Sequence, residues 1–201
     1  MAGERMEWTD EITSVQRHLA RYVWALRWCA GKRVLDVGCG IGYGTAMIAN
    51  VAQSVTGIDV SADAFRAARR TYPLYPNFLH SSVEDFVATS GFDVVVAIEV
   101  LEHLSDMGSG LRKLMGIAEE AVLVSLPVLA GGNPYHHERH WTIEECDEYV
   151  DRYAKGKWTL LDPCYQPLRD TSNCEIRKRP IEDRDNVGYL QYVIWTGGGV
   201  R

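Results

Sequence analysis

Apolar residues recur along the chain with two different spacings, one typical of helices and one of strands. Over residues 10–29 they fall three or four apart, at Ile12, Val15, Leu19, Tyr22, Val23 and Leu26. That spacing predicts an amphipathic helix that begins after Asp10, its expected N-cap, and ends at Gly31. Further helices are predicted over 45–52, over 61–70 with Ser61 as N-cap, and around 111–118.

Short apolar runs stand between these helices. The strand-like stretches are 34–37, 54–60, 77–82, 92–100, 121–127, 158–168 and 188–196. Strands that alternate with helices predict an α/β fold with a doubly wound, mostly parallel seven-stranded sheet and helices on both faces. No helical pattern separates the last two stretches. They are therefore predicted to form a C-terminal antiparallel hairpin, with the charged residues 175–186 as its solvated loop.

The composition is that of a globular protein with one domain. The chain has 201 residues, of which 46% are hydrophobic and 24% charged. No apolar run reaches the length of a membrane span, and the polar start is unlike a secretory signal. The five cysteines contain no CxxC pair, which favours a reduced, cytoplasmic setting. The net charge of −6 disfavours broad binding of nucleic acids through their phosphates.

Four glycines alternate directly after the first strand, in the stretch LDVGCGIGYG. Glycine lets the backbone approach a ligand closely at the carboxyl end of a strand, where α/β proteins bind nucleotides. A dinucleotide site requires GxGxxG, but the third glycine is replaced by Tyr43, Thr45 or Met47 in the three registers. The stretch has instead an acid, Asp36, followed by GxGxG. Asp59, which ends the second strand, is an acid that can accept both hydroxyls of an adenosine ribose.

These motifs occur in a recognisable order. The series LDVGCGIGYG, GIDVS, SSVEDF and FDVVVAIEVLEHL resembles that of class I S-adenosylmethionine-dependent methyltransferases. The resemblance covers most of the chain and implies a Rossmann-like fold with S-adenosylmethionine as cofactor. It implies a single domain over residues 1–201, with an N-terminal helical lid at 1–31 and the Rossmann-like core at 32–201.

The resemblance also implies where the cofactor is held. Asp36 and the glycine loop would hold the two ends of its methionine, Asp59 its ribose, and Ser82 and Val83 would flank its adenine. Ser82 stands where the family often has Asp. The residues implied in this site are Asp36, Gly38, Cys39, Gly40, Gly42, Tyr43, Asp59, Val60, Ser82, Val83, Ile98 and Glu99.

Two segments offer a base for a hydroxyl acceptor. In the first, EVLEHL, the side chains of Glu99, Glu102 and His103 would share one face if the segment starts a helix. The second is NPYHHERHW, which follows the end of a predicted strand and contains His136, His137 and His140.

The histidine-rich segment is predicted to lie just before a helix. Thr142 and Glu145 have the spacing of a capping box, and Trp141 and Cys146 occupy the positions of a hydrophobic staple. The helix dipole would disfavour a charged imidazole there, so that a histidine stays neutral and able to accept a proton.

The same segment carries a second resemblance. NPYHHERHWT is similar to the N-P-[FY]-H-x-[RK]-E loop of methyltransferases from bacterial surface-glycan clusters, and HLARYVWAL with GKRVLDVGCGIGYG resembles their N-terminal entry. His137 matches the loop histidine, and His140 stands where those proteins usually have Glu. This resemblance implies an oxygen acceptor on a sugar or small metabolite, with His137 or His103 as catalytic base.

A third resemblance implies a different activity, that of metal-dependent small-RNA 3′-end ribose 2′-O-methyltransferases. The matching set is Glu99, Glu102, His103 and His137, followed by Trp141 and Thr142. Two carboxylates and two imidazoles could hold Mg²⁺ or Mn²⁺ and lower the pKa of a bound hydroxyl. The motif E-x-L-E-H-L also occurs in methyltransferases without metal, where Glu102 and His103 more often form a helix-start hydrogen bond.

The sequence thus predicts an S-adenosylmethionine-dependent methyltransferase that acts on a small-molecule or glycan acceptor. One alternative is the metal-dependent RNA 2′-O-methyltransferase. Another, outside the enzymes, is a non-catalytic module that binds S-adenosylmethionine and acts through a partner protein. A nicotinamide oxidoreductase is disfavoured by the glycine spacing.

Overall fold

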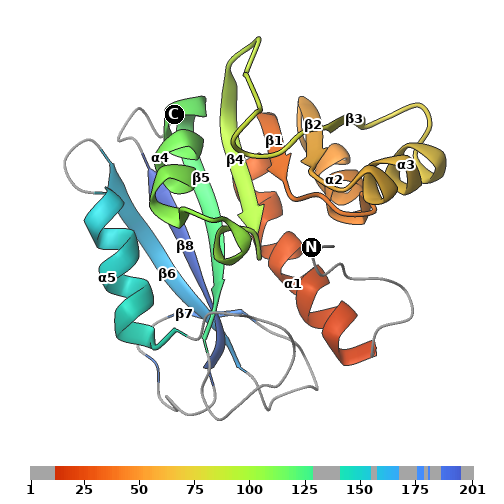
Figure 1. Ribbon diagram of the computed structural model, residues 1–201. Helices are drawn as coiled ribbons and strands as arrows, with labels where there is room; N and C mark the ends of the chain where they lie inside the picture. Colours follow the sequence, from red (N-terminus) through yellow and green to blue (C-terminus); the bar gives the residue numbers. More distant parts are fainter. Residues whose placement is uncertain are drawn as a thin grey trace.

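The structure is a computed structural model that describes residues 12–128, 141–154, 158–167, 176–178, 181 and 187–195. Its helices are α1 (Ile12–Cys29), α2 (Tyr43–Ala49), α3 (Ala62–Thr71), the 3₁₀ helix η1 (Leu101–His103), α4 (Met107–Ile117) and α5 (Ile143–Ala154). Its strands are β1 (Arg33–Val37), β2 (Ser54–Asp59), β3 (Asn77–His80), β4 (Phe92–Ile98), β5 (Ala118–Pro127), β6 (Thr159–Pro167), β7 (Arg177–Lys178) and β8 (Val187–Trp195). Figure 1 shows these elements coloured along the chain.

The strands form one sheet in the order β3-β2-β1-β4-β5-β8-β6-β7. The first five strands are parallel, whereas β8 runs antiparallel to its two neighbours, β5 and β6. After β3 the chain crosses back over β2 and β1 to begin β4. The order of the strands therefore reverses between β1 and β4, and open α/β sheets bind their ligands at the carboxyl ends of the strands beside such a point.

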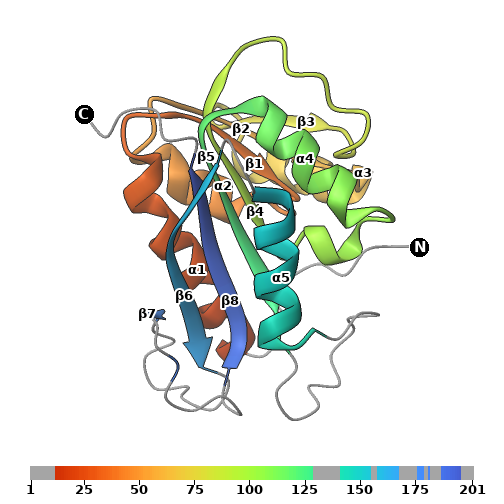
Figure 2. The same cartoon turned by 90° about the vertical axis from the view of Figure 1, so that its left-hand side faces the viewer.

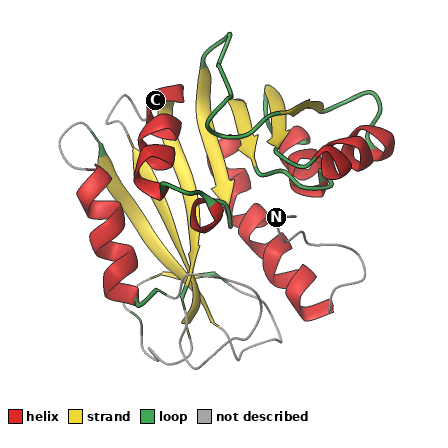
Figure 3. Cartoon of the chain, viewed as in Figure 1, coloured by secondary structure: helices red, strands yellow, loops and turns green. Residues whose placement is uncertain are grey.

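Helices cover both faces of the sheet, as Figures 2 and 3 show. On one face α1 and α2 contribute Tyr22 and Ile48 to a buried cluster, and on the other α4 and α5 contribute Leu111 and Val150. Successive residues of β4 belong alternately to the two clusters, because side chains of a strand point to opposite faces in turn. None of the helices in the described residues is long and apolar enough to span a membrane.

The predicted fold class is confirmed, with one strand more than predicted. Strand β7 lies within the segment that was expected to be only a solvated loop, where Lys178 pairs with Cys164 and Arg177 with Tyr165 of β6. An edge strand of two charged residues uses its backbone for pairing and carries no apolar pattern. The hydropathy of the segment therefore could not indicate it.

The predicted helix around 111–118 is α4, but its bounds differ. It begins four residues earlier, at Met107, because the carboxylate of Asp106 accepts a hydrogen bond from Ser109 N at 3.0 Å and so caps it. Ala118, the predicted last residue, already belongs to β5. The Ser61 cap of α3 is confirmed by a hydrogen bond from Ala64 N to Ser61 Oγ at 3.4 Å. The N-cap predicted at Asp10 lies outside the described residues.

Candidate functional site

The loop between β1 and α2 has a backbone that favours glycine. Gly38, Gly40 and Gly42 have φ angles of 65°, 56° and 89°, in the left-handed region that other residues adopt only at a cost. Two hydrogen bonds anchor the loop to β2: Cys39 N donates to Ile58 O at 3.0 Å, and Gly40 N donates to Asp59 Oδ2 at 2.8 Å. The loop therefore keeps one conformation at the carboxyl edge of the sheet.

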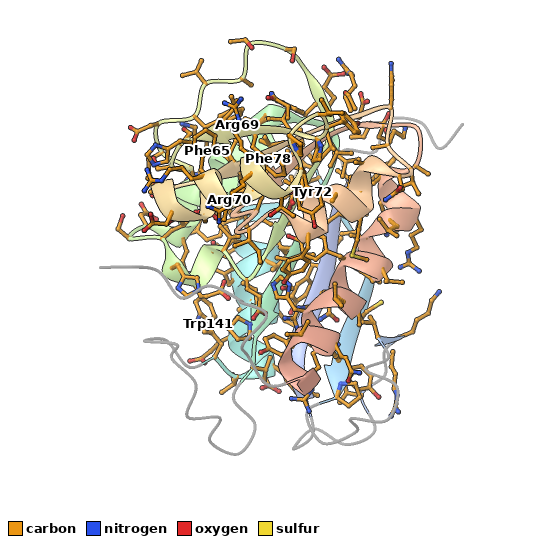
Figure 4. All side chains as sticks on the ribbon, turned by 90° about the vertical axis from the view of Figure 1, so that its right-hand side faces the viewer. Phe65, Arg69, Arg70, Tyr72, Phe78 and Trp141 are labelled. Carbon is orange, nitrogen blue, oxygen red and sulfur yellow. The ribbon has the colours of Figure 1, made fainter. Side chains whose placement is uncertain are left out.

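Close packing also requires glycine in this loop. A Cβ atom on Gly42 would lie 2.6 Å from Phe78 Cζ, and one on Gly38 would lie 2.6 Å from Val100 Cγ2. Phe78 itself packs with Phe65 and Tyr72 between α3 and β3, and Figure 4 labels these rings. The glycine loop is thus wedged between the β3 side of the site and the turn that follows β4.

Asp36 is fully buried behind this loop. Its carboxylate accepts hydrogen bonds from Thr45 Oγ1 at 2.6 Å and from the Tyr22 hydroxyl at 3.3 Å, which links β1 to α2 and α1. Burial raises the pKa of this carboxyl to about 7, although the two hydrogen bonds lower it. The structure therefore places the first acid of the motif among protein partners rather than at the surface of the site.

Asp59 closes β2 and is 8% exposed. Besides Gly40 N, it accepts a hydrogen bond from Ser61 N, at 2.7 Å from Oδ1. Each carboxylate oxygen has two lone pairs, so both can accept a further hydrogen bond from a ligand hydroxyl. The next residue, Val60, keeps 68% of its surface exposed, which leaves an apolar side chain directly beside the acid.

The other residues predicted for the cofactor site differ in what they can offer. Val83 and Ile98 are buried, with Ile98 in the core on the α1 face, and the Cys39 side chain is buried as well. The hydroxyl of Ser82 donates to Asp85 Oδ2 at 2.8 Å and accepts from Asp85 N, so it caps the next turn. Because the side chain of Cys39 is buried, this residue can contact a ligand only through its backbone.

Tyr43, at the start of α2, joins the glycine loop to α1. Its hydroxyl lies 2.5 Å from Nδ1 of His18, and the rings of His18, Tyr22 and Tyr43 contact one another. Burial and the charge of Arg21 lower the pKa of His18 well below its ordinary value. A neutral His18 therefore helps to hold α1, the predicted lid, against the loop.

A buried arginine lies on the far side of the site, beside the turn after β4 and away from Asp59. Arg21 of α1 is 1% exposed, donates from Nη1 to Gln166 Oε1 at 2.7 Å, and lies 4.0 Å above the ring of Tyr189. Its Nη2 is 3.4 Å from Glu99 Oε2. Glu99 has a φ of 58°, and its backbone N–H donates to Ser125 Oγ at 3.1 Å. Four elements thus fix the turn after β4.

Glu99, Glu102 and His103 do not share a helix face, and the prediction that they would is wrong. Because Glu99 has left-handed backbone and η1 spans only three residues, the α-helical i, i+3, i+4 geometry does not form. Glu102 is buried, whereas His103 is exposed. Within the described ranges, no group of three or more His, Cys, Asp or Glu side chains could hold a metal ion. The fourth residue of the proposed metal set, His137, lies outside those ranges.

The histidine-rich segment is outside the described residues up to residue 140, so the predicted roles of His136, His137 and His140 stay predictions. The start of the helix that follows it is described. Thr142 N donates to Glu145 Oε2 at 2.7 Å and Glu145 N donates to Thr142 Oγ1 at 3.1 Å, which confirms the capping box. Trp141, labelled in Figure 4, packs with buried Cys146 on one core cluster.

Sequence reasoning missed the residues that meet at the far side, namely Arg21, Gln166 and Tyr189. Arg21 and Gln166 are 145 positions apart. Gln166 and Tyr189 belong to no recognised motif, and the stretch HLARYVWAL, which contains Arg21, implied no role for it. No pattern in the sequence marked Arg21, because it lies on the side of the first helix away from the predicted apolar stripe. In the structure the buried side of this helix includes Arg21 and Tyr22, whereas Val23 of the predicted stripe is exposed.

Comparisons with known proteins find methyltransferases among the proteins similar to this chain. Residues 35–120 match the family model described as "Methyltransferase domain". The mitochondrial ubiquinone biosynthesis O-methyltransferase of Schizosaccharomyces pombe is 37% identical over 92 residues, 43% of this chain and 34% of that protein. A probable S-adenosylmethionine-dependent methyltransferase of Mycolicibacterium smegmatis is 37% identical over 115 residues, 56% of this chain and 44% of that protein. The chain thus spans less than half the length of these curated relatives.

Solved structures share the whole fold. The N-methyltransferase NodS of Bradyrhizobium japonicum, in complex with S-adenosyl-L-homocysteine, superposes with a TM-score of 0.69 at 16% identity, over 98% of this chain and 94% of that one. The methyltransferase domain of bacterial CtHen1 gives a TM-score of 0.68 at 21% identity, over 92% of this chain and all of that one. Residues 35–120 thus resemble a methyltransferase domain, and the described chain has the fold of these methyltransferase structures.

Proposed function

We propose that the chain transfers a methyl group from S-adenosylmethionine to a hydroxyl oxygen of a sugar or other small molecule. The observation that carries the proposal is the joined geometry of the glycine loop and Asp59. Gly40 N is held at 2.8 Å by Asp59 Oδ2, and both carboxylate oxygens keep lone pairs for ribose hydroxyls. The loop backbone and the acid thus form one preorganised unit at the switch point of the sheet.

The residues of the candidate site fit S-adenosylmethionine. The glycine loop allows the close backbone approach that the amino-acid end needs, and exposed Val60 beside Asp59 offers the adenosine an apolar contact. Glu99, on the other side of the loop, would face the methionine end. Asp36 acts indirectly, by holding α1 and α2 around the loop through Tyr22 and Thr45. When bound, S-adenosylmethionine supplies a methyl group made electrophilic by its sulfonium.

The protein's own contribution to the reaction is orientation and proton removal. It must hold the acceptor oxygen in line with the methyl group, exclude water and receive the hydroxyl proton. His103, exposed in η1 just after β4, and His137 are the proposed bases, and a positioned base contributes roughly 10²–10⁴-fold to the rate. An oxygen acceptor is supported by the relatives named ubiquinone biosynthesis O-methyltransferases.

Thermal unfolding with S-adenosylhomocysteine, and separately with NAD, tests the cofactor. At a hundred times its dissociation constant a ligand adds about 2.7 kcal/mol, which raises the Tm of a domain of this size by roughly 5–10 °C. We expect that shift with S-adenosylhomocysteine and none with NAD. The absence of a shift with saturating S-adenosylhomocysteine would overturn the proposal. Binding without turnover across a panel of hydroxyl acceptors would favour the non-catalytic module.

A further inference from the structure

Glu102 has an unusual environment for a carboxylic acid. Its side chain belongs to a residue that is 7% exposed, and within the part of the chain that the structure describes neither of its oxygens has a hydrogen-bond partner. The other two buried acids of the site, Asp36 and Asp59, each accept two hydrogen bonds. Burying a polar group without a partner destabilises a fold, so within the described part of the chain this carboxyl lowers stability.

The residues around Glu102 do not compensate for the burial of its carboxyl group. Arg21, whose positive charge acts on Glu102, pairs with Glu99, donates to Gln166 and lies over the ring of Tyr189. Burial, and then the negative charge of Glu99, raise the pKa of Glu102, while its own backbone N–H and then the charge of Arg21 lower it only in part. Glu99 in turn keeps a positive φ, a conformation that costs free energy and is concentrated at functional sites. Two destabilising features, the left-handed backbone of Glu99 and the carboxyl of Glu102 without a hydrogen-bond partner, are therefore three positions apart in the chain.

Glu99 and Glu102 lie beside the glycine loop. Both residues follow β4, and Val100 between them packs against Gly38 of the glycine loop. Arg21, Gln166 and Tyr189 extend the cluster toward β6 and β8, away from Asp59, which lies across β1 on β2. With the cofactor held as proposed, its methionine end would lie toward this cluster, and we expect the methyl acceptor on this side.

We propose that Glu102 is a substrate-binding residue whose carboxyl accepts a hydrogen bond from a hydroxyl of the methyl acceptor. The inference rests on the proposed function and specifies its substrate. An acceptor with a neutral hydroxyl next to the methylated atom satisfies the buried carboxyl. An acceptor with a carboxylate at that place adds a third acid beside Glu99 and Glu102, and Arg21, which already pairs with Glu99, has only its Nε without a hydrogen-bond partner among the described residues. The site therefore selects neutral polyols or phenols over carboxylic acids.

Stability provides the first test, because it needs no acceptor. Replacing Glu102 with leucine removes the unsatisfied carboxyl while Arg21 keeps its contact with Glu99. We expect the Tm of the free protein to rise by roughly 3–8 °C. Glu148→Leu, at an exposed position of α5, is the matched control and is expected to change the Tm little. A lower Tm in Glu102→Leu would show that the carboxyl serves the fold, and would overturn the inference.

Binding provides the second test. Saturation-transfer NMR on the protein saturated with S-adenosylhomocysteine is expected to detect catechol or methyl glucoside with wild type, to lose them with Glu102→Leu, and to detect no trans-aconitate. The affinity for S-adenosylhomocysteine itself should change less than twofold. Hydroxyl probes that bind both proteins equally, or neither, would overturn the inference, as would a Mn²⁺-dependent rise in Tm that Glu102→Leu abolishes. If S-adenosylhomocysteine binds neither protein, the proposed function fails, and the Tm comparison still reports on Glu102.

Discussion

At the scale of single residues, Asp59 does two things at once. It holds Gly40 N and Ser61 N at 2.8 and 2.7 Å, and its oxygens retain lone pairs that, under the proposed function, accept hydrogen bonds from a ribose. In Asp59→Asn one acceptor oxygen becomes a donor and the charge is lost. Hydrogen bonds to a charged group contribute about 1.5–3 kcal/mol, so we expect the affinity for S-adenosylhomocysteine, measured by calorimetry, to fall roughly 10- to 100-fold.

The control for this change is Asp63→Asn. Asp63 is an exposed acid in the first turn of α3 whose carboxylate pairs with Arg66. Its removal alters the net charge by the same amount without touching the loop, so the affinity should stay within twofold. Equal affinities of Asp59→Asn and wild type would show that the ribose is held elsewhere.

Asp36 makes stability depend on pH. The unfolded chain releases this proton near pH 4, whereas the folded protein retains it up to about pH 7 because the carboxyl is buried. The folded state therefore binds more protons within this window, and the free energy of unfolding falls as the pH rises through it. Relative to Asp36→Asn, we expect wild type to lose about 2–3 kcal/mol between pH 5 and pH 8.

Urea unfolding of both proteins at pH 5, 6, 7 and 8 measures this difference. Asn at position 36 keeps an oxygen for Thr45 Oγ1 and has no proton to release, so other titrating groups cancel in the comparison. Parallel pH curves for the two proteins would contradict the expected burial of Asp36. The wild-type curve should be the steeper one, and stability should decrease toward alkaline pH.

The sequence points to candidate site residues where a local pattern marks them. An acid before alternating glycines and an acid at the end of the next strand indicated Asp36, the loop and Asp59. The same patterns do not tell which way a side chain points. The carboxylate of Asp36 faces Thr45 and Tyr22. Glu99 has a left-handed rather than a helical backbone, and its predicted contact with His103 depended on a helix.

At the scale of elements, the docking of α1 onto α2 depends on one missing side chain. A Cβ atom on Gly44 would lie 2.0 Å from Cζ of Tyr22, whose ring is buried and whose hydroxyl donates to Asp36. Gly44→Ala should therefore displace α1. Overpacking of this kind costs about 1–3 kcal/mol, and we expect that loss in urea unfolding together with faster proteolysis within α1.

Gly116→Ala separates this steric effect from helix propensity. Gly116 is an exposed residue of α4, and a Cβ atom there meets nothing within 4 Å. Alanine favours a helix over glycine by up to ~1 kcal/mol, so this variant should be slightly stabilised. A Gly44→Ala protein as stable as Gly116→Ala would show that α1 is not held by the contact between Tyr22 and α2.

The elements themselves were the most predictable part of the chain. Each of the seven predicted strands and the helices between them has a hydrophobic period, because each buries one or both faces against a neighbour. Strand β7 has no such period, since it pairs only through its backbone at the edge of β6. The contact between Arg21 and Gln166 spans 145 positions, and it exists only once the sheet has brought α1 and β6 together.

At the scale of the whole molecule, the two ends of the parallel strands, the carboxyl edge and the amino edge of the sheet, carry different kinds of residue. The carboxyl edge carries the glycine loop, Asp59 and Glu99. The amino edge carries ion pairs, with Arg33 of β1 bound to Asp93 of β4 and Glu119 of β5, and Lys32 bound to Glu120. Asp93 also accepts a hydrogen bond from Arg33 N at 2.8 Å. These pairs link three neighbouring parallel strands at the end opposite to the candidate site.

This division predicts that stability and ligand affinity can be changed separately. Asp93→Asn weakens the ion pair at the amino edge, and because such partly exposed pairs contribute little, we expect the Tm to fall by only ~2–4 °C. The affinity for S-adenosylhomocysteine should remain within twofold, whereas Asp59→Asn loses affinity with a smaller change in the Tm of the free protein. Melting curves and calorimetry on the two variants give the comparison. An Asp93→Asn protein with clearly weakened ligand binding would mean that the strands transmit strain from one edge of the sheet to the other, and that the ion pairs are part of how the site is held.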